Sequence, residues 1–300
     1  MRGGMARSSQ ALFCADTLRN RSLEGGGFPF YPGGAFRTDA TAWAVLALAL
    51  ATTGTRDHDI VDSGRDRLAA SQLEDGRVSV SSSDPGSFWP TSLAILAWHG
   101  SSKYAKHESR ATDFLLRTTG KHWEKQENSP LAHDTSIQGW PWMQDTHSWV
   151  EPTSLSILAL RITGMGEHER IREGVRMLMD RQLPSGGWNH GNTLTFGTEQ
   201  FPQADCTGIA LNALAGEVPK TDVEKSVKYL RTQVTRLRTP LSLGWGILGL
   251  AAWGRRPGQA TAWLGECLAR QDLFGSYDTT LLSLLLIALE GRSGLGSMFG

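Results

Sequence analysis

The chain has 300 residues with 30 basic and 30 acidic side chains, so its formal net charge is zero. A balanced charge lacks the electrostatic footprint of a nucleic-acid-binding protein, and we expect no nucleic-acid partner. Forty per cent of the residues are hydrophobic, accompanied by 34 glycines and 11 tryptophans, which is typical of a globular chain with a substantial core.

Cysteine usage and the lengths of the apolar runs bear on location. Cys14, Cys206 and Cys267 lie far apart in the sequence, which favours a reducing compartment over a disulfide framework. The longest apolar runs, residues 40–51 and 281–289, fall well short of the ~20 residues that a membrane-spanning helix needs. We therefore expect a cytoplasmic protein, with any membrane contact limited to a peripheral one for access to substrate.

Apolar segments that open with a hydroxyl residue recur along the chain and predict one set of helices. In chain order they begin at Thr41, Thr91, Thr153, Thr207, Ser242 and Thr280, the Ser242 copy being weaker. They are apolar nearly all round, which is typical of helices enclosed by other helices. Each is followed by a glycine, where we expect a left-handed C-terminal cap. These glycines are Gly54, Gly100, Gly164, Gly216, Gly254 and Gly291.

Amphipathic segments alternate with the apolar ones and predict a second set of helices. They span residues 10–21, 59–72, 103–117, 167–182, 221–234 and 259–271. Because all-apolar helices must be shielded from water, six such pairs favour an all-α, double-layered barrel of six outer and six inner helices. An open solenoid is the alternative. We expect one domain over residues 1–300, with short flexible termini at about 1–8 and 292–300.

Several sequence motifs resemble those of a known superfamily. The string Arg181-Gln182-Leu-Pro-Ser-Gly186-Gly187-Trp188 resembles the glutamine-tryptophan motif of squalene and oxidosqualene cyclases. The strings His147-Ser-Trp-Val-Glu-Pro-Thr153 and Gly186-Gly-Trp-Asn-His-Gly-Asn192 look like those of single-domain bacterial prenyltransferase and squalene oxidase repeat proteins. The resemblance covers residues 10–290 and implies an (α/α)6 toroid with a central, mostly apolar cavity.

Carboxyl groups near the starts of the apolar helices are candidate catalytic residues. In the proton-initiated terpene cyclases of this superfamily, an Asp-x-Asp-Asp-Thr string occupies that position and its central Asp donates the proton. Aligned on the threonine, this chain keeps only the central acid, as Asp39. Glu151, Asp205 and Asp278 occupy the same place in other repeats, so we expect a ring of four acids at one mouth of the barrel.

Glu151 is our preferred proton donor and Asp39 the second choice. Asp145, His147 and Trp149 precede Glu151 and offer it both polar partners and an apolar wall, and desolvation by such a wall raises the pKa of a carboxyl group. The structural alternative is that all four acids only cap helices or interact with helix dipoles.

Aromatic residues gather where the linkers meet the apolar helices. We expect side chains from this set to contact substrate, because aromatic faces stabilise cations. The candidates are Trp43, Trp89, Trp142, Trp149, Trp245 and His147. The alternative is that the indoles only hold the helical hairpins together.

The resemblance implies a terpenoid-cyclase-like enzyme that binds an apolar, isoprenoid-type small molecule and starts its cyclisation or rearrangement by protonation. Two other functions stay open: a non-catalytic toroid that binds a lipid or peptide, and a carbohydrate-processing (α/α)6 enzyme with paired carboxylates. Protein prenyltransferases share the toroid and bind zinc through Asp, Cys and His, but here Asp205 adjoins Cys206 and no partner histidine matches. We expect no metal and no cofactor, and the sequence leaves the oligomeric state open.

Overall fold

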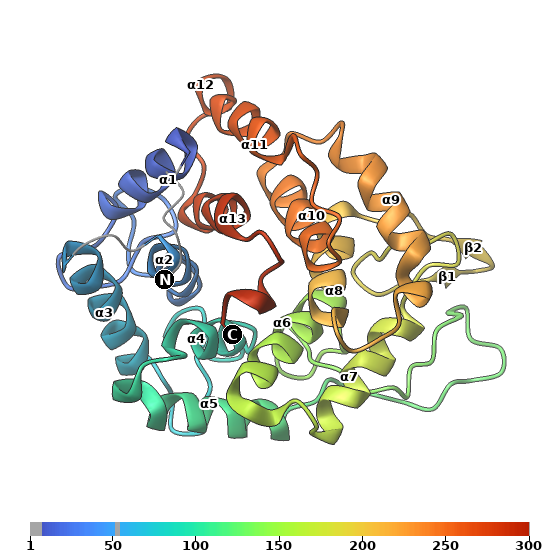
Figure 1. Ribbon diagram of the computed structural model, residues 1–300. Helices are drawn as coiled ribbons and strands as arrows, with labels where there is room; N and C mark the ends of the chain where they lie inside the picture. Colours follow the sequence, from blue (N-terminus) through green and yellow to red (C-terminus); the bar gives the residue numbers. More distant parts are fainter. Residues whose placement is uncertain (1–7, 52–54, 300) are drawn as a thin grey trace.

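The computed structural model describes residues 8–51 and 55–299, and its regular structure is almost entirely helical (Figure 1). The inner helices are α2 (Thr38–Leu50), α4 (Pro90–Trp98), α6 (Val150–Leu160), α8 (Ala204–Leu214), α10 (Pro240–Ala252) and α13 (Thr279–Glu290). The outer helices are α1 (Ser9–Arg19), α3 (Thr55–Ala70), α5 (Ala105–Arg117), α7 (Glu169–Asp180), α9 (Glu224–Val234) and α11 (Ala260–Ala269). The minor elements are η1 (Ser102–Tyr104), η2 (Arg161–Met165), β1 (Leu194–Thr195), β2 (Thr198–Glu199), η3 (Lys220–Val223), α12 (Gln271–Phe274) and η4 (Gly296–Met298).

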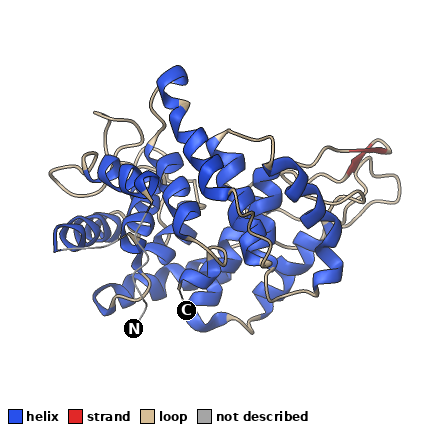
Figure 2. Cartoon of the chain, turned by 45° about the horizontal axis from the view of Figure 1, so that its top comes forward, coloured by secondary structure: helices blue, strands red, loops and turns tan. Residues whose placement is uncertain are grey.

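The inner helices form a closed ring. Each contacts the next along the chain, and α13 contacts α2, so the last inner helix meets the first. The outer helices α3, α5, α7, α9 and α11 each pack on the inner helix that precedes them, and α1 packs on α13. The double-layered (α/α)6 toroid is thereby confirmed, and the open solenoid is excluded. The hairpin of β1 and β2 projects from one side (Figure 2).

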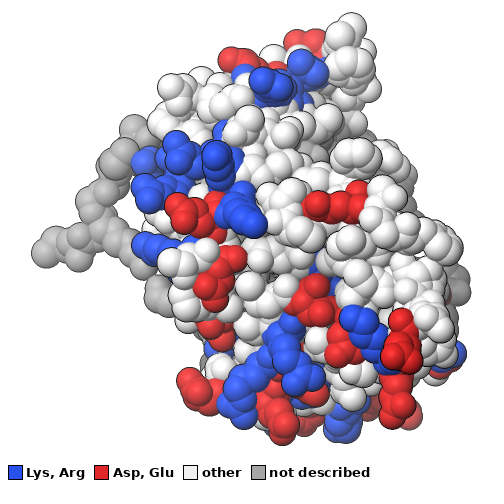
Figure 3. Space-filling model, turned by 90° about the vertical axis from the view of Figure 1, so that its right-hand side faces the viewer, with Lys and Arg blue, Asp and Glu red and all other residues white. Residues whose placement is uncertain are grey.

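Burial follows the two hydrophobic patterns. Every residue of α2 from Thr38 to Leu48 is buried, as expected for a helix enclosed on all sides. In α7 only one stripe is buried, which includes Ile171, Met177 and Leu178. Charged side chains of both signs are interspersed on the face shown in Figure 3.

Two tryptophans occupy the interior of the ring. Trp43 of α2 and Trp245 of α10 meet edge to face with ring centroids 5.7 Å apart, and both are almost fully buried. Because α13 lies between α2 and α10 in the ring, this contact crosses the interior. The central cavity implied by the resemblance is therefore filled by indoles at this level.

The hydroxyl residues that open the inner helices anchor the preceding linkers. The backbone N–H groups of Phe28, Val78, Trp140 and Trp188 donate to the hydroxyls of Thr41, Thr91, Thr153 and Thr207 at 2.8–3.0 Å. Ser242 and Thr280 differ from these four. Within the described residues, no linker N–H donates to the Ser242 hydroxyl, and Thr280 Oγ1 is buried without a hydrogen-bond partner. The recurring threonine thus marks a packing contact between linker and helix.

The glutamine-tryptophan motif also has a packing role. Gln182 Nε2 donates to the Asp222 carbonyl oxygen at 3.1 Å and to Ser226 Oγ at 2.8 Å, which ties the end of α7 to the start of α9. Trp188 is fully buried, and its Nε1 donates to the Leu178 carbonyl oxygen at 2.7 Å. Both residues of the motif therefore join neighbouring segments of the toroid.

The C-terminal segment covers the mouth formed by the C-terminal ends of the inner helices. Leu295 is fully buried and its N–H donates to Asn212 Oδ1 of α8 at 2.9 Å, so the segment around Leu295 packs on the ring. Arginines complete this mouth, since Arg65, Arg161 and Arg256 donate to terminal carbonyl oxygens of α4, α8 and α13.

The expected left-handed glycines are confirmed at four of the five described helix ends. Gly100, Gly164, Gly216 and Gly254 have φ between 68° and 87°. Gly291 has φ of −74°, so the prediction there is wrong: the chain continues directly into the segment that covers the mouth. Gly54 lies outside the described residues.

Candidate active site

The four predicted acids lie at the N-terminal ends of inner helices and form two electrostatic pairs. Asp39 and Asp278 come from the neighbouring helices α2 and α13, and the charge of Asp39 acts on Asp278. Glu151 and Asp205 come from the neighbouring helices α6 and α8, and the charge of Asp205 acts on Glu151. The ring of acids is therefore two pairs rather than four equivalent groups.

Asp39 and Asp278 are engaged in structural contacts. Both carboxylate oxygens of Asp39 accept from Arg37, at 2.9 Å from Nε and 2.7 Å from Nη2, which leaves the buried Asp39 in an ion pair. Asp278 is the N-cap of α13, and its Oδ1 accepts from the Leu281 N–H at 2.9 Å. Burial raises the pKa of Asp278, and the Leu281 and Thr280 N–H groups oppose this effect.

Glu151 has a different environment. It lies in the first turn of α6, partly buried, and its carboxyl group makes no hydrogen bond or ion pair within the described residues. Burial and, next, the charge of Asp205 raise the pKa of Glu151 to about 7. A carboxyl group with this pKa is protonated in about half of the molecules at neutral pH, so Glu151 can act as a general acid.

His190 and Cys206 stand beside the Glu151–Asp205 pair. The His190 carbonyl oxygen accepts from the Val150 N–H, and its Nδ1 lies 3.6 Å from Cys206 Sγ. Burial, followed by the charges of Asp205 and Glu151, raises the pKa of the Cys206 thiol, which disfavours the nucleophilic thiolate. The sequence gives no signal that places His190 beside this pair, because His190 lies in the linker before α8 and no spacing rule relates that linker to α6.

The predicted aromatic residues divide between the mouth and the core. Trp89 and Trp142 meet edge to face with centroids 5.4 Å apart, and the His147 and Trp149 rings lie 4.4 Å apart. All four are at least partly exposed, and Trp89 and Trp149 are the N-cap residues of α4 and α6. Trp43 and Trp245, by contrast, are core residues and line no open space at the mouth.

A pocket of about 350 Å³ adjoins this mouth and shares Trp149 with it. It lies between the long linker that precedes α6 and the segment that follows Trp188. Its lining residues are Lys121, His122, Trp123, Leu131, His133, Thr135, His147, Ser148, Trp149, Arg181, Gly191 and Asn192. Of these, only His147 and Trp149 were predicted as site residues. Ser148, Arg181, Gly191 and Asn192 lie in the motif strings but were not singled out as site residues, and the others belong to the linker that precedes α6.

Across residues 8–51 and 55–299, no cluster of three or more His, Cys, Asp and Glu side chains is arranged to hold a metal ion. None of the helices in the described part of the chain combines the length and hydropathy of a membrane span.

Neither a protein-family model nor a curated protein matches this sequence. Solved structures do match. A variant of the type II terpene cyclase MstE from Scytonema, in complex with geranylgeranyl dihydroxybenzoate, is 13% identical, covers 97% of each chain and has a TM-score of 0.63. An α-amylase from Clostridium perfringens is 10% identical over 96% of this chain and 99% of its own, with a TM-score of 0.65.

A third similar structure, an α-1,6-mannanase from Salegentibacter, is 11% identical over 95% of this chain and 98% of its own, with a TM-score of 0.62. At such low identity these likenesses show the fold alone. The chain therefore has the (α/α)6 toroid fold of these solved structures, which include a terpene cyclase and two carbohydrate-processing enzymes.

Proposed function

We propose that the chain is a terpenoid-cyclase-like enzyme. It binds an apolar, polyprenyl-type substrate at the mouth formed by the inner-helix N-termini, and Glu151 donates the proton that starts cyclisation or rearrangement. The observation that carries this proposal is the unpaired, partly buried Glu151 carboxyl, whose pKa is about 7 and which follows Trp149 by two residues.

The proposed chemistry conserves the atoms of the substrate. The Glu151 proton adds to one carbon of an alkene, the π electrons form the new C–H bond, and the other carbon becomes a cation. Aromatic faces at the mouth, such as those of Trp149 and Trp89, stabilise that cation. Loss of a proton from the rearranged cation to the Asp205 carboxylate ends the reaction, and proton transfer back to Glu151 completes the cycle.

The experiment is incubation of the protein with polyprenyl alcohols and polyprenyl diphosphates, with analysis of the products. Glu151→Gln should lower turnover at least about 100-fold, because removal of a general acid costs this much. Glu74→Gln, at an exposed glutamate, is the matched control and should leave turnover unchanged. Wild-type turnover that survives in Glu151→Gln would refute the donor assignment, and no turnover of any probe by the wild type would count against the substrate class.

A second candidate function is glycoside hydrolysis, favoured by the electrostatic coupling of Glu151 with Asp205. Glycosidases use two carboxyls, one protonated and one ionised, and a pKa near 7 suits protonation of a leaving oxygen. The filled interior of the ring is compatible with a substrate bound at the mouth. Release of reducing sugar from starch or α-1,6-mannan, lost in both Glu151→Gln and Asp205→Asn, would support this function over the first.

We also propose that the protein acts in the cytoplasm and contacts membranes peripherally to obtain its substrate. The support is a group of exposed aromatic side chains on or near the projecting hairpin: Phe196 is 83% exposed, Phe201 87% and Trp123 47%. Such exposed apolar groups can insert into the lipid interface. Co-sedimentation with phosphatidylcholine vesicles should fall in Phe196→Ser and Phe201→Ser, and unchanged co-sedimentation would argue against this contact.

A further inference from the structure

The pocket beside Trp149 combines basic groups with aromatic walls. Its lining includes the cations Lys121 and Arg181 and the imidazoles of His122, His133 and His147, but no Asp or Glu. The walls come from Trp123, Leu131 and Trp149. At about 350 Å³ the pocket is within the usual range for a small-molecule site.

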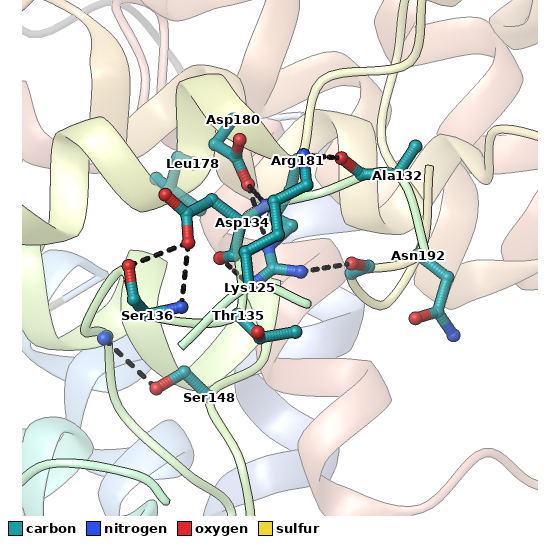
Figure 4. Close-up of polar contacts among 12 residues, drawn as sticks. Lys125, Ala132, Asp134, Thr135, Ser136, Ser148, Leu178, Asp180, Arg181 and Asn192 are labelled. Carbon is teal, nitrogen blue, oxygen red and sulfur yellow. Dashed lines mark hydrogen bonds and ion pairs between the residues drawn. The ribbon is translucent and has the colours of Figure 1, made fainter. Parts of the chain in front are cut away.

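Arg181 is the buried cation of this pocket, with 6% of its surface exposed (Figure 4). Its Nη1 donates to the Gly191 carbonyl oxygen at 3.3 Å and its Nη2 to the Asp134 carbonyl oxygen at 3.2 Å. Its Nε makes no hydrogen bond in the described residues, and the nearest carboxylate oxygen, Asp180 Oδ2, is 3.5 Å away. A guanidinium has five N–H donors, so three remain for another acceptor.

The charge of Arg181 persists in this environment. Burial lowers the pKa of Arg181 to about 10, which still leaves the side chain cationic at neutral pH. Asp180 offsets part of this charge, while the Asp134 carboxylate is turned to the N–H and hydroxyl of Ser136. The pocket therefore keeps a positive character.

Two imidazoles and Lys121 add further polar groups to the pocket. His133 is 6% exposed, and its Nδ1 is buried without a hydrogen-bond partner among residues 8–51 and 55–299. His122 Nε2 lies 3.3 Å from Ser148 Oγ. Lys121 is at the rim, where its Nζ is 3.8 Å from Asp145 Oδ1 and both side chains are mostly exposed. A buried imidazole nitrogen without a partner costs free energy, which a bound polar group can recover.

We propose that this pocket binds an oxyanion, either a carboxylate or a phosphate, carried by a molecule whose remainder is apolar. Arg181, His133, His122 and Lys121 surround the anion, and the rings of Trp123, His147 and Trp149 contact the apolar part next to it. Only the role of this pocket in catalysis rests on the proposed function. In that role, the substrate is an isoprenoid with an anionic head group that binds beside Trp149, while its chain lies at the mouth. The binding itself does not depend on Glu151.

The test is calorimetric titration of the whole chain at pH 7 with three probes that share one hydrocarbon chain: farnesyl monophosphate, farnesoic acid and neutral farnesol. We expect at least one of the two anions to bind at least 10-fold more tightly than farnesol, and the tighter of the two identifies the head group. Equal affinity for all three probes, or no binding of either anion, would overturn the proposal.

Three variants locate the binding site. His133→Phe keeps a ring but removes both nitrogens, and Lys121→Met removes the charge at the rim. Each should weaken binding of the preferred anion at least 5-fold and leave that of farnesol unchanged. Lys106→Met, at an exposed position of α5, is the matched control and should bind as the wild type does. Thermal unfolding of each variant checks that it is folded. Unaltered anion affinity in both folded pocket variants would refute the site.

Glu151→Gln separates this inference from the proposed function. It should bind the preferred anion as tightly as the wild type does. If the anion binds but no substrate is turned over, the pocket stands and the catalytic proposal fails. If polyprenyl substrates are turned over without any preference for an anionic head, the catalytic proposal stands and the assignment of the pocket to the substrate's head group fails.

Discussion

The two mouths of the toroid are formed by opposite ends of the same six helices, yet the polar groups at the two mouths differ in their hydrogen-bond partners. At the C-terminal ends, Arg65, Arg161 and Arg256 bind helix carbonyl oxygens, and Leu295 packs across the opening. At the N-terminal ends, the Glu151 carboxyl has no hydrogen-bonding partner within the described residues, and a basic pocket adjoins it. Unsatisfied groups are expected where a protein binds something else. We therefore expect the C-terminal mouth to contribute mainly to stability, and the proposed chemistry belongs to the N-terminal mouth.

The largest expected effect comes from removing an indole of the core. Trp43→Ala should lower the free energy of unfolding by about 4 kcal/mol, because it opens a cavity against Trp245. Trp142 lies at the mouth and is partly exposed, so Trp142→Ala removes less buried apolar area and should lower the free energy of unfolding by only about 1 kcal/mol. Urea unfolding of both variants measures the difference. Equal losses would erase the distinction between core and mouth.

The second effect concerns pH. The folded chain raises the pKa of Glu151 from 4.5 to about 7, so ionisation of this group is less favourable in the folded than in the unfolded state. The wild type should lose stability as pH rises from about 4.5 to 7, by at most about 3 kcal/mol, and the loss should level off above pH 7.

Glu151→Gln removes this ionisation. The free energy of unfolding of the variant minus that of the wild type should therefore increase as pH rises from 4.5 to 8. Urea unfolding at several pH values is the measurement. Glu74 is exposed, so the free energy of unfolding of Glu74→Gln should vary with pH as that of the wild type does. A Glu151→Gln curve that also runs parallel would show that Glu151 is ionised normally.

The smallest effect compares two threonines at the N-terminal ends. Thr207→Val leaves the buried Trp188 N–H without its acceptor and should lower the free energy of unfolding by about 2 kcal/mol. Thr280→Val removes a buried hydroxyl that has no partner in the described ranges, and should raise stability by about 1 kcal/mol. Thermal unfolding of the pair measures the sign of each change, and a loss in both would show that Thr280 has a polar partner after all.

The fold could be predicted because apolar residues recur in the sequence with the period of the buried face of each helix. Helices such as α2, apolar on every side, and helices such as α7, apolar on one stripe, alternate six times, and only a closed two-layered ring hides the first kind. The filled interior could not be predicted, because the meeting of Trp43 and Trp245 depends on the diameter of the ring. The spacing of residues in the sequence does not give the diameter of the ring.

The candidate site was predictable in part. The alignment on threonine places Asp39, Glu151, Asp205 and Asp278 at helix starts, which is where they lie, but their roles as catalytic groups stay a prediction. Their partners depend on tertiary structure: Arg37 turns back onto Asp39, whereas no described residue forms a hydrogen bond or ion pair with the Glu151 carboxyl. The pocket residues His122, His133 and Arg181 were missed because linker conformation is set by contacts between segments far apart in the sequence.

The closure of α13 onto α2 has a consequence for synthesis. The first and last inner helices share an interface, and Leu295 is anchored to α8, so the ring cannot close until α13 has been synthesised, after the other five inner helices. Until then, the apolar sides of α2 and α10 that α13 covers stay exposed to water. Folding must therefore wait for a contact between residues about 240 positions apart, which makes the nascent toroid slow to fold and dependent on protection from aggregation.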